Sequence, residues 1–348
     1  MGKAARMGTA MQMDQVQDLP VYLSDDFRVV DGAALGDGLA DGDDLILDDA
    51  YALRANAGQH RLSIFQPDRQ ANSAFVIDAG STVGVAGHEL HLDCTITLMG
   101  PDGETFDAVV LVEVDPEAGV IEQVYMLALA PVREKTSYHL VGIDQSNAQT
   151  RMAQAACVSF SRGTHITMAS GEQRPIEDLR VGDKVLTRDQ GPQTIRWIGQ
   201  TTMRAVGEFA PVLIKKSALN NLNDLVVSPN HRLFIYQRID EIGAGRSEVL
   251  VKAKHLINGT TVTRVNGGFV DYFQLLFDEH QIIFAEGIAA ESLLLDMRTS
   301  AVLPADLACD IYGSGLVDHR NNHNNFEVDN WQQNGGDVVE RLRRASCG

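Results

Sequence analysis

Two short motifs carry the residues best suited to chemistry in this chain. Ser159-Phe-Ser-Arg-Gly-Thr164 opens a segment with a hydroxyl nucleophile, and Ser228-Pro-Asn-His231 places a histidine after a second hydroxyl. A hydroxyl that directly follows a peptide carbonyl can attack that carbonyl, and the resulting N-to-O acyl shift turns the amide into a more reactive ester. Histidine is the usual acid for the departing nitrogen near neutral pH. Together the motifs predict self-processing at the Val158–Ser159 bond.

Each residue has a role in this interpretation, and two alternatives stay open. Ser159 is the nucleophile, His231 the general acid, and Ser228 and Asn230 are the polar supports that hold the scissile amide. A histidine between apolar stretches is more often a satisfied core residue, which is the competing role for His231. Cys157 is a rival nucleophile. It would shift the register of the following Gly-Thr pair by two residues, so Ser159 is favoured.

The elements that must position these residues are predicted to be β-strands. Short apolar segments rich in β-branched residues alternate with Gly- and Asp-rich turns, which is typical of an all-β chain. Strands are expected at 75–78, 83–86, 90–98, 108–114 and 120–129. The expected organisation is a flexible N-terminus (1–18), a β-rich domain (19–145), a linker or short exposed helix (146–156), a second β domain (157–297) and a polar, disordered tail (298–348).

The second β domain contains an internal repeat. Leu179-x-x-Gly182-x-x-Val185 is matched by Leu256-x-x-Gly259-x-x-Val262, and each copy is followed by Thr and then Arg. This pattern predicts a duplicated β unit folded as two related halves around a pseudo-twofold axis. Coincidence among turn signals is the competing explanation.

Net charge and hydropathy exclude several classes of partner. The formal net charge is −18 over 348 residues, whereas phosphate binding requires clustered Lys and Arg, so nucleic acid is not an expected partner. No apolar run approaches the roughly 20 residues of a membrane span. The first residues lack the continuous apolar stretch of a secretory signal. We expect no membrane span, and either a cytoplasmic location or export without a classical signal peptide.

No cofactor or metal ion is expected either. The four cysteines are far apart and form no CxxC pair, which argues against zinc and against a disulfide framework. They are Cys94, Cys157, Cys309 and Cys347. The Gly- and Asp-rich stretch Gly36–Asp49 has the composition of a calcium-binding loop but lacks the nonapeptide repeat of calcium-binding β-rolls. An ordinary acidic turn is favoured there.

Several motifs occur in a fixed order from Ser159 onward. They are Ser159-Phe160 through Gly163-Thr164-x-Ile166, Gly171-Glu-x-Arg-Pro-Ile-Glu-Asp-Leu-x-Val-Gly-Asp-x-Val-Leu-Thr187, Arg196-Trp-Ile-Gly199, Leu225-Val-Val-Ser-Pro-Asn-His-Arg232, Val251-Lys-Ala-Lys-His-Leu256 and Leu276-Phe-Asp-Glu-His280. In this order they resemble the Hint superfamily, the fold shared by inteins and Hedgehog processing domains, and above all the bacterial Hedgehog/intein-type Hint domains. The resemblance implies an intein-like all-β fold at residues 159–292 and autoprocessing, with the chain's own backbone as the substrate.

The chain departs from the family at both ends of the domain. The family usually has cysteine where this chain has Ser159, and a serine hydroxyl is a poorer nucleophile than a thiol. Natural variation and engineered replacement are both open origins of this serine. Inteins close with His-Asn, where this chain has Glu291 and Ser292. Without the asparagine amide no succinimide forms, so cleavage or acyl transfer is expected without splicing.

Two further questions stay open at this stage. His280 resembles a downstream histidine of the family and would assist the reaction; a polar strand residue beside Asp278 and Glu279 is an equal alternative. The acyl acceptor is water or another nucleophile, in a single-turnover reaction. The alternative function is a structural or surface-interaction protein with an inactive Hint fold.

Overall fold

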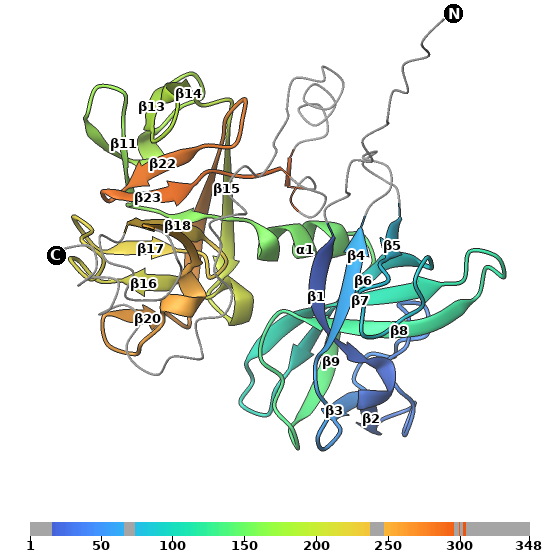
Figure 1. The fold of residues 1–348 in the computed structure, drawn as a ribbon. Coiled ribbons are helices and arrows are strands. Elements are labelled where there is room, and N and C mark those ends of the chain that lie inside the picture. Colours follow the sequence, from blue (N-terminus) through green and yellow to red (C-terminus); the bar gives the residue numbers. More distant parts are fainter. Residues whose placement is uncertain (1–15, 66–73, 237–246, 296–298, 300–301, 304–348) are drawn as a thin grey trace, which may run out of the picture. The chain divides into compact units, whose positions relative to one another are not determined.

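Antiparallel strands supply almost all of the regular structure. The protein is described by a computed structural model over residues 16–65, 74–236, 247–295, 299 and 302–303. These residues form 23 strands, one α-helix and four short 3-10 helices, which confirms the all-β prediction. The chain divides into two units, residues 1–128 with 132–148 and residues 129–131 with 149–348 (Figure 1). None of the helices in the described ranges is long and apolar enough to cross a membrane.

The two terminal segments of the expected organisation lie largely outside the described residues. The tail expected at 298–348 is described only at Thr299, Val302 and Leu303. The N-terminal segment expected to be flexible up to residue 18 is described from Val16. Its last two residues already belong to the strand Gln17–Leu23, so regular structure begins before the expected boundary.

The first unit is built around a closed ring of six strands. Its strand order is β2-β3-β9-β6-β5-β4-β1-β8-β7, and β6 also pairs with β7, which closes the run from β6 to β7. Closure protects the strand edges. The elements are β1 (Gln17–Leu23), the 3-10 helix η1 (Ser24–Asp26), β2 (Phe27–Asp31), β3 (Ala50–Leu53), β4 (His60–Phe65), β5 (Phe75–Ile77), β6 (Glu89–Met99), β7 (Thr105–Val114), β8 (Ile121–Ala128) and β9 (Ser137–Asp144).

Strand β7 shows how the sequence specifies this ring. Its central residues 108–112 (AVVLV) are apolar at every position, and all of them are buried. Side chains of a strand alternate between its two faces, so a continuous apolar run predicts packing on both sides. One of these faces shares a core with Phe27 and Tyr51, whose rings stack 5.3 Å apart.

The strand expected at Val83–Ala86 is wrong, because this segment is a loop. Gly84 has φ +79°, a left-handed conformation that an extended strand does not use. A Cβ there would lie 2.9 Å from the Tyr125 hydroxyl. The loop is held by the buried Glu113 carboxylate, which accepts hydrogen bonds from the Val85 amide (2.9 Å) and the Tyr125 hydroxyl (2.6 Å). β-branched residues here flank a turn that needs glycine.

The acidic stretch Gly36–Asp49 folds as turns around a buried carboxylate. Asp49 is 1% exposed and accepts hydrogen bonds from the Ala33 amide at 2.6 Å and the Ala34 amide at 3.1 Å. Its oxygens are therefore occupied by the chain's own backbone. No group of three or more metal-ligand side chains occurs in the part of the chain that the structure describes.

The second unit contains two antiparallel sheets. One has the order β15-β21-β10-β17-β16-β20, and the other has β12-β11-β22-β23-β18-β19, with β13 pairing β14 and β22. The elements are α1 (Ala148–Ala156), β10 (Phe160–Ser161), β11 (His165–Thr167), β12 (Gln173–Pro175), η2 (Ile176–Asp178), β13 (Lys184–Thr187), β14 (Gly191–Thr194), β15 (Trp197–Arg204), η3 (Gly207–Phe209), β16 (Val212–Ile214), β17 (Leu225–Val227), β18 (Arg232–Tyr236), β19 (Glu248–Lys252), η4 (Ala253–Leu256), β20 (Val262–Arg264), β21 (Phe269–Leu276), β22 (Ile282–Ala285) and β23 (Ile288–Glu291).

One apolar core joins the two sheets. Phe160 and Val227 of the first sheet share this core with Leu233 of the second.

The two copies of the sequence repeat have similar local structure, in line with the predicted duplication. A 3-10 helix, η2 or η4, leads into each copy of the repeat, and each copy passes a glycine with positive φ. Gly182 has φ +96° and Gly259 has φ +76°. Each copy then enters a strand with a fully buried valine.

The segment between the two β regions forms a helix with little exposure. Residues 146–156 were expected to be a linker or a short exposed helix, yet no residue of α1 is exposed, and Met152 and Ala153 are buried. The expected exposure is therefore wrong for the helix itself. Asp144 closes the turn before the helix by accepting a hydrogen bond from the Asn147 side chain (2.7 Å). Hydrogen bonds of this kind lower the pKa of Asp144 to about 2.

Candidate functional site

Ser159 immediately precedes β10 and lies between two polar residues, Ser228 and Gln274, of the neighbouring chain segments. Phe160, the next residue, pairs with both β17 and β21. One residue earlier in the same registers, Ser159 lies between Ser228 on the β17 side and Gln274 on β21. Gly199 of β15 is in turn opposite Gln274. Residues at one level of an antiparallel sheet point to the same face, so this row brings their side chains together.

The contacts of Ser159 reach its hydroxyl, its amide and its carbonyl. Ser159 is 3% exposed, and its Oγ accepts a hydrogen bond from Gln274 Nε2 at 3.2 Å. Its amide N–H donates to Ser228 Oγ at 3.0 Å, and its carbonyl accepts from the Ser228 amide at 2.9 Å. The Ser228 hydroxyl donates to the Cys157 carbonyl at 3.2 Å. Ser228 therefore contacts the nitrogen of the Val158–Ser159 bond and the carbonyl of Cys157, one residue before Val158.

His231 reaches the same residue from the turn that joins the two sheets. This turn, residues 228–231, leads from β17 of the first sheet into β18 of the second. The imidazole Nδ1 lies 3.0 Å from the Ser159 carbonyl oxygen. A carbonyl only accepts, so Nδ1 carries the proton. The Phe160 ring packs against the imidazole with 4.3 Å between centroids. Burial lowers the pKa of His231 to about 4, so the ring is neutral at pH 7.

Asn230 and Cys157 have roles other than those the sequence suggested first. Asn230 Nδ2 donates to the Ala155 carbonyl at 2.8 Å, so it holds the end of α1 rather than the scissile amide. Cys157 is 1% exposed and packs with Leu276 and Leu293 in an apolar cluster. Apolar surroundings disfavour a thiolate. Cys157 thus packs as a core side chain, whereas the Ser159 hydroxyl has a polar contact with Gln274.

Sequence reasoning missed Gln274, the residue in contact with the Ser159 hydroxyl. Its side chain lies above Gly199 on the neighbouring strand. A Cβ at Gly199 would lie 2.6 Å from Gln274 Oε1 and 2.3 Å from Trp197 Cη2, so only glycine leaves room for the amide. The sequence contains a signal for Gln274, since it is the one polar residue within the apolar run FQLLF. In the structure its side chain is buried, with 5% exposed. Buried polar groups in such runs have a specific partner.

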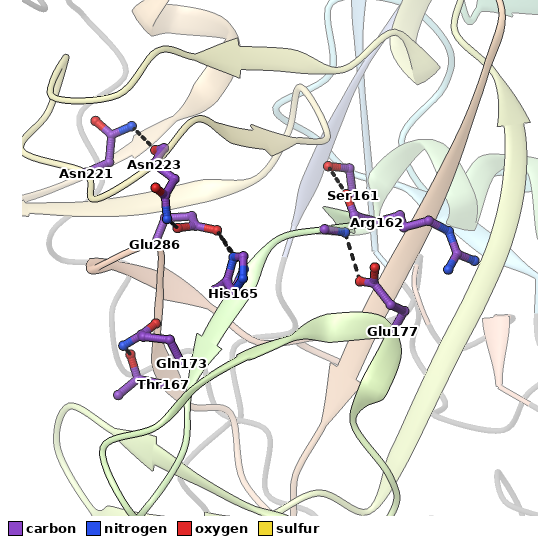
Figure 2. A network of polar contacts seen from close by, with 10 residues as sticks. Ser161, Arg162, His165, Thr167, Gln173, Glu177, Asn221, Asn223 and Glu286 are labelled. Carbon is purple, nitrogen blue, oxygen red and sulfur yellow. Dashed lines mark hydrogen bonds and ion pairs between the residues drawn. The ribbon is translucent and has the colours of Figure 1, made fainter.

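The segment that follows Ser159 is held by two carboxylates (Figure 2). Glu177 accepts a hydrogen bond from the Gly163 amide at 2.8 Å. The buried Glu286 accepts from the His165 amide at 2.7 Å, from His165 Nδ1 at 2.9 Å and from Asn223 Nδ2 at 2.8 Å. Asn223 lies in the loop before β17. Glu286 therefore ties the strand after the Ser159 segment to the loop that leads to the histidine-bearing turn.

The residues at the end of the domain form a separate buried group. Ser292 is fully buried, and its Oγ accepts a hydrogen bond from the Gln281 amide at 2.9 Å. The buried Glu291 carboxylate accepts a hydrogen bond from Arg232 Nε, and its other oxygen lies 3.6 Å from His280 Nε2. His280 lies in the turn between β21 and β22 and is only 8% exposed. It is thus a buried turn residue beside Glu291 rather than a polar strand residue.

Comparison with known proteins finds a match over this second unit. The family model of the Hint domain matches residues 158–297. Among solved structures, the MchDnaB-1 intein aligns with 13% identity and a gp41-1 intein variant with 10%. Each alignment covers 38% of this chain and 98% of the intein, with a TM-score of 0.25. Likeness of that size carries no functional argument. No curated protein matches the chain.

Proposed function

We propose that the chain breaks its own Val158–Ser159 bond, since residues 158–297 match the family model of the Hint domain. The observation that supports this most strongly is the arrangement of side chains around Ser159. Gln274 contacts the hydroxyl that would attack, and Ser228 contacts the nitrogen that would leave. His231 contacts the carbonyl of the same residue. All of these groups are buried, and hydrogen bonds are stronger where the local dielectric constant is low.

The first step is an N-to-O acyl shift. The Ser159 Oγ attacks the Val158 carbonyl carbon, a C–O bond forms, the C–N bond breaks, and the hydroxyl proton ends on the Ser159 nitrogen. The product is an ester between residue 158 and the Ser159 side chain, with a free α-amine on Ser159. Water or another nucleophile then attacks the ester, which releases residues 1–158 and regenerates the hydroxyl. Gln274 donates a hydrogen bond to the attacking oxygen and fixes its position.

The leaving nitrogen must gain that proton from a group within reach. While the amide is intact, its N–H donates to Ser228 Oγ. When the C–N bond lengthens, the nitrogen lone pair becomes an acceptor, and the Ser228 hydroxyl can turn from the Cys157 carbonyl to donate to it. His231 carries a proton at Nδ1, which it donates to the carbonyl of Ser159. We assign His231 the role of proton donor and acceptor in this exchange.

The end of the domain supports cleavage or acyl transfer rather than splicing. Splicing requires a side-chain amide that cyclises onto its own backbone carbonyl. Glu291 and Ser292 occupy this end, and neither carries an amide. The Glu291 carboxylate is bound to Arg232, and the Ser292 hydroxyl is bound to the Gln281 amide. Neither group is placed for chain cleavage after residue 292.

Mass spectrometry of the purified full-length chain tests this function. With hydroxylamine, we expect a fragment of residues 1–158 that ends in a hydroxamate and a second fragment that begins at Ser159. Ser159→Cys should cleave faster because a thiol is the better nucleophile, and a thiol reagent should then release the same fragment. Ser159→Ala should stay intact.

Ser161→Ala is the matched control. Ser161 lies two residues further along, on β10, and is also buried, and its hydroxyl donates a hydrogen bond to the neighbouring Arg162 carbonyl at 3.4 Å. It should cleave at the unchanged rate. If folded Ser159→Cys stays intact with hydroxylamine and with thiol, the proposal fails, and an inactive Hint fold with a structural or surface-interaction function replaces it.

A further inference from the structure

The Val158–Ser159 bond does not lie at the boundary between the two compact units. The second unit comprises residues 129–131 and 149–348, so it includes two segments that precede this bond. These upstream segments are residues 129–131 and 149–158. The Hint family model matches residues 158–297, so the upstream segments lie almost entirely outside the matched range. Cleavage before Ser159 would therefore cut the chain inside a compact unit.

The longer upstream segment is hydrogen-bonded to the turn that carries His231. The Ala155 carbonyl, at the end of α1, accepts a hydrogen bond from Asn230 Nδ2 at 2.8 Å. The Cys157 carbonyl accepts one from the Ser228 hydroxyl at 3.2 Å. Both acceptors precede the bond that would break, and both donors follow it. These hydrogen bonds therefore join the two future fragments.

The same segment also takes part in an apolar cluster of the second unit. The Cys157 side chain is 1% exposed and packs with Leu276, which ends β21, and with Leu293, which follows β23. Val158 is 8% exposed. The hydrophobic effect depends on the apolar area removed from water and not on the continuity of the backbone. This packing therefore holds across a broken peptide bond as well.

The shorter upstream segment, residues 129–131, packs against η3. The Glu208 amide donates a hydrogen bond to the Leu129 carbonyl at 2.7 Å, and Leu129 is 3% exposed. Gly207 has φ +53°, and a Cβ there would lie 2.2 Å from the Leu129 oxygen and 2.5 Å from the Ala130 Cβ. The two backbones approach so closely that only glycine fits between them.

Both upstream segments belong to the same future fragment, residues 1–158. Once one segment is bound, the other is held close to its own binding surface, so its binding is effectively intramolecular. Cleavage changes only the bond between residues 158 and 159, and none of the contacts described above requires that bond. Dissociation requires that both segments leave the second unit.

We propose that the upstream segments hold residues 1–158 noncovalently on the rest of the second unit after cleavage, so that processing yields a complex of two chains rather than two separate proteins. This inference rests on the proposed self-processing reaction. The surface formed by η3, the turn 228–231 and the apolar cluster around Leu276 and Leu293 then binds a defined partner, which is the chain's own former N-terminal part.

Size-exclusion chromatography of the cleaved full-length chain tests the proposal. The chain is treated with hydroxylamine until denaturing mass spectrometry shows only residues 1–158 and 159–348. On a native column, the two fragments should elute together at the position of the uncleaved Ser159→Ala chain, and they should separate in urea. If they elute separately under native conditions, the proposal is overturned.

Gly207→Ala shows whether the contact with η3 contributes. The added Cβ should displace residues 129–131, so the dissociation constant of the two fragments, measured by dilution, should rise about tenfold, the effect of one lost hydrogen bond. Gly171→Ala is the matched control, since Gly171 also has positive φ (+84°) but no atom lies within 4 Å of its Cβ position. Equal dissociation constants for the two variants overturn the proposal. If Gly207→Ala does not fold, elution of the native fragments decides.

Hydrogen exchange in the uncleaved Ser159→Ala chain gives an arm that is independent of cleavage. The Cys157 amide donates to the Ala153 carbonyl at 2.9 Å, and the Ser228 amide donates to the Ser159 carbonyl at 2.9 Å. If the longer upstream segment is part of the second unit, the exchange rates of both amides should rise in parallel with added urea. A Cys157 amide that exchanges by a local opening insensitive to urea overturns the proposal. A native chain that never cleaves contradicts the proposed function instead, and this measurement still decides whether the segment is held.

Discussion

Ser228→Ala tests whether the Ser228 hydroxyl acts in cleavage or serves only to hold the end of a strand. The Ser228 hydroxyl accepts a hydrogen bond from the Ser159 amide at 3.0 Å and donates one to the Cys157 carbonyl at 3.2 Å. Ser228 is 7% exposed, so water does not readily replace the lost hydroxyl. The substitution removes both bonds but keeps the backbone bond between the Ser228 amide and the Ser159 carbonyl.

The magnitude follows from these two contacts. A buried amide N–H that loses its acceptor costs about 1–3 kcal/mol, and the loss of one hydrogen bond to a carbonyl costs about 0.5–1.5 kcal/mol. We therefore expect the free energy of unfolding to fall by about 2–4 kcal/mol. The hydroxyl also contacts the nitrogen that must be protonated, so cleavage should slow by about 100-fold, the lower end of the range for a proton-transfer group.

Two assays measure these effects separately. Urea unfolding at pH 7, in the Ser159→Ala background, gives the change in stability without cleavage. Mass spectrometry with hydroxylamine, in the chain with native Ser159, gives the change in rate. Ser228→Thr keeps the hydroxyl and is the matched control, which should retain most of the stability and the rate. The reasoning is refuted if Ser228→Ala is as stable as the unchanged chain and cleaves as fast.

Three further predictions concern the surroundings of the site. Burial lowers the pKa of His231 from 6.5 to about 4, so between these pH values the unfolded chain binds a proton that the folded chain does not. The free energy of unfolding should therefore drop by up to about 3 kcal/mol as the pH falls from 6.5 to 4. Urea unfolding of His231→Gln should lack this drop. Gly199→Ala should displace Gln274 and slow hydroxylamine cleavage about tenfold, the effect of one lost hydrogen bond; an unchanged rate would show that Gln274 does not position the hydroxyl. Glu286→Gln should lower the free energy of unfolding by about 2 kcal/mol, since it weakens three hydrogen bonds. If urea unfolding shows no change in this free energy, Glu286 does not stabilise the connection between His165 and Asn223.

Much of the architecture could be predicted from local patterns. Apolar runs such as residues 108–112 are long enough to specify a strand buried on both faces, and β7 forms there. The Ser228–His231 motif lies between two apolar strands, β17 and β18, and the structure brings both of its end residues into contact with Ser159. These are effects of periodicity and of short-range turn chemistry, which a sequence displays directly.

The remaining details depend on tertiary contacts that no local pattern contains. The loop at Val83–Ala86 follows from a buried carboxylate on another strand, so β propensity alone predicted the wrong structure. Gln274 reaches Ser159 only through the register of β10 with β21. The His231 ring has Nδ1 on the Ser159 carbonyl rather than on the amide nitrogen, and it packs against the ring of Phe160. Sequence could name this residue but not its hydrogen-bond partner.

The most direct test of the central claim follows the scissile amide itself. The sequence contains Val-Ser twice, at 158–159 and at 227–228. With isotope-labelled valine carbonyl carbons and serine nitrogens, a carbonyl-to-amide correlation spectrum therefore shows two signals, and the pair at 227–228 is an internal reference. On addition of hydroxylamine, the account predicts that the 158–159 signal disappears while the 227–228 signal persists. If both signals keep their full intensity while the folded protein is incubated with hydroxylamine, Ser159 does not attack the bond before it.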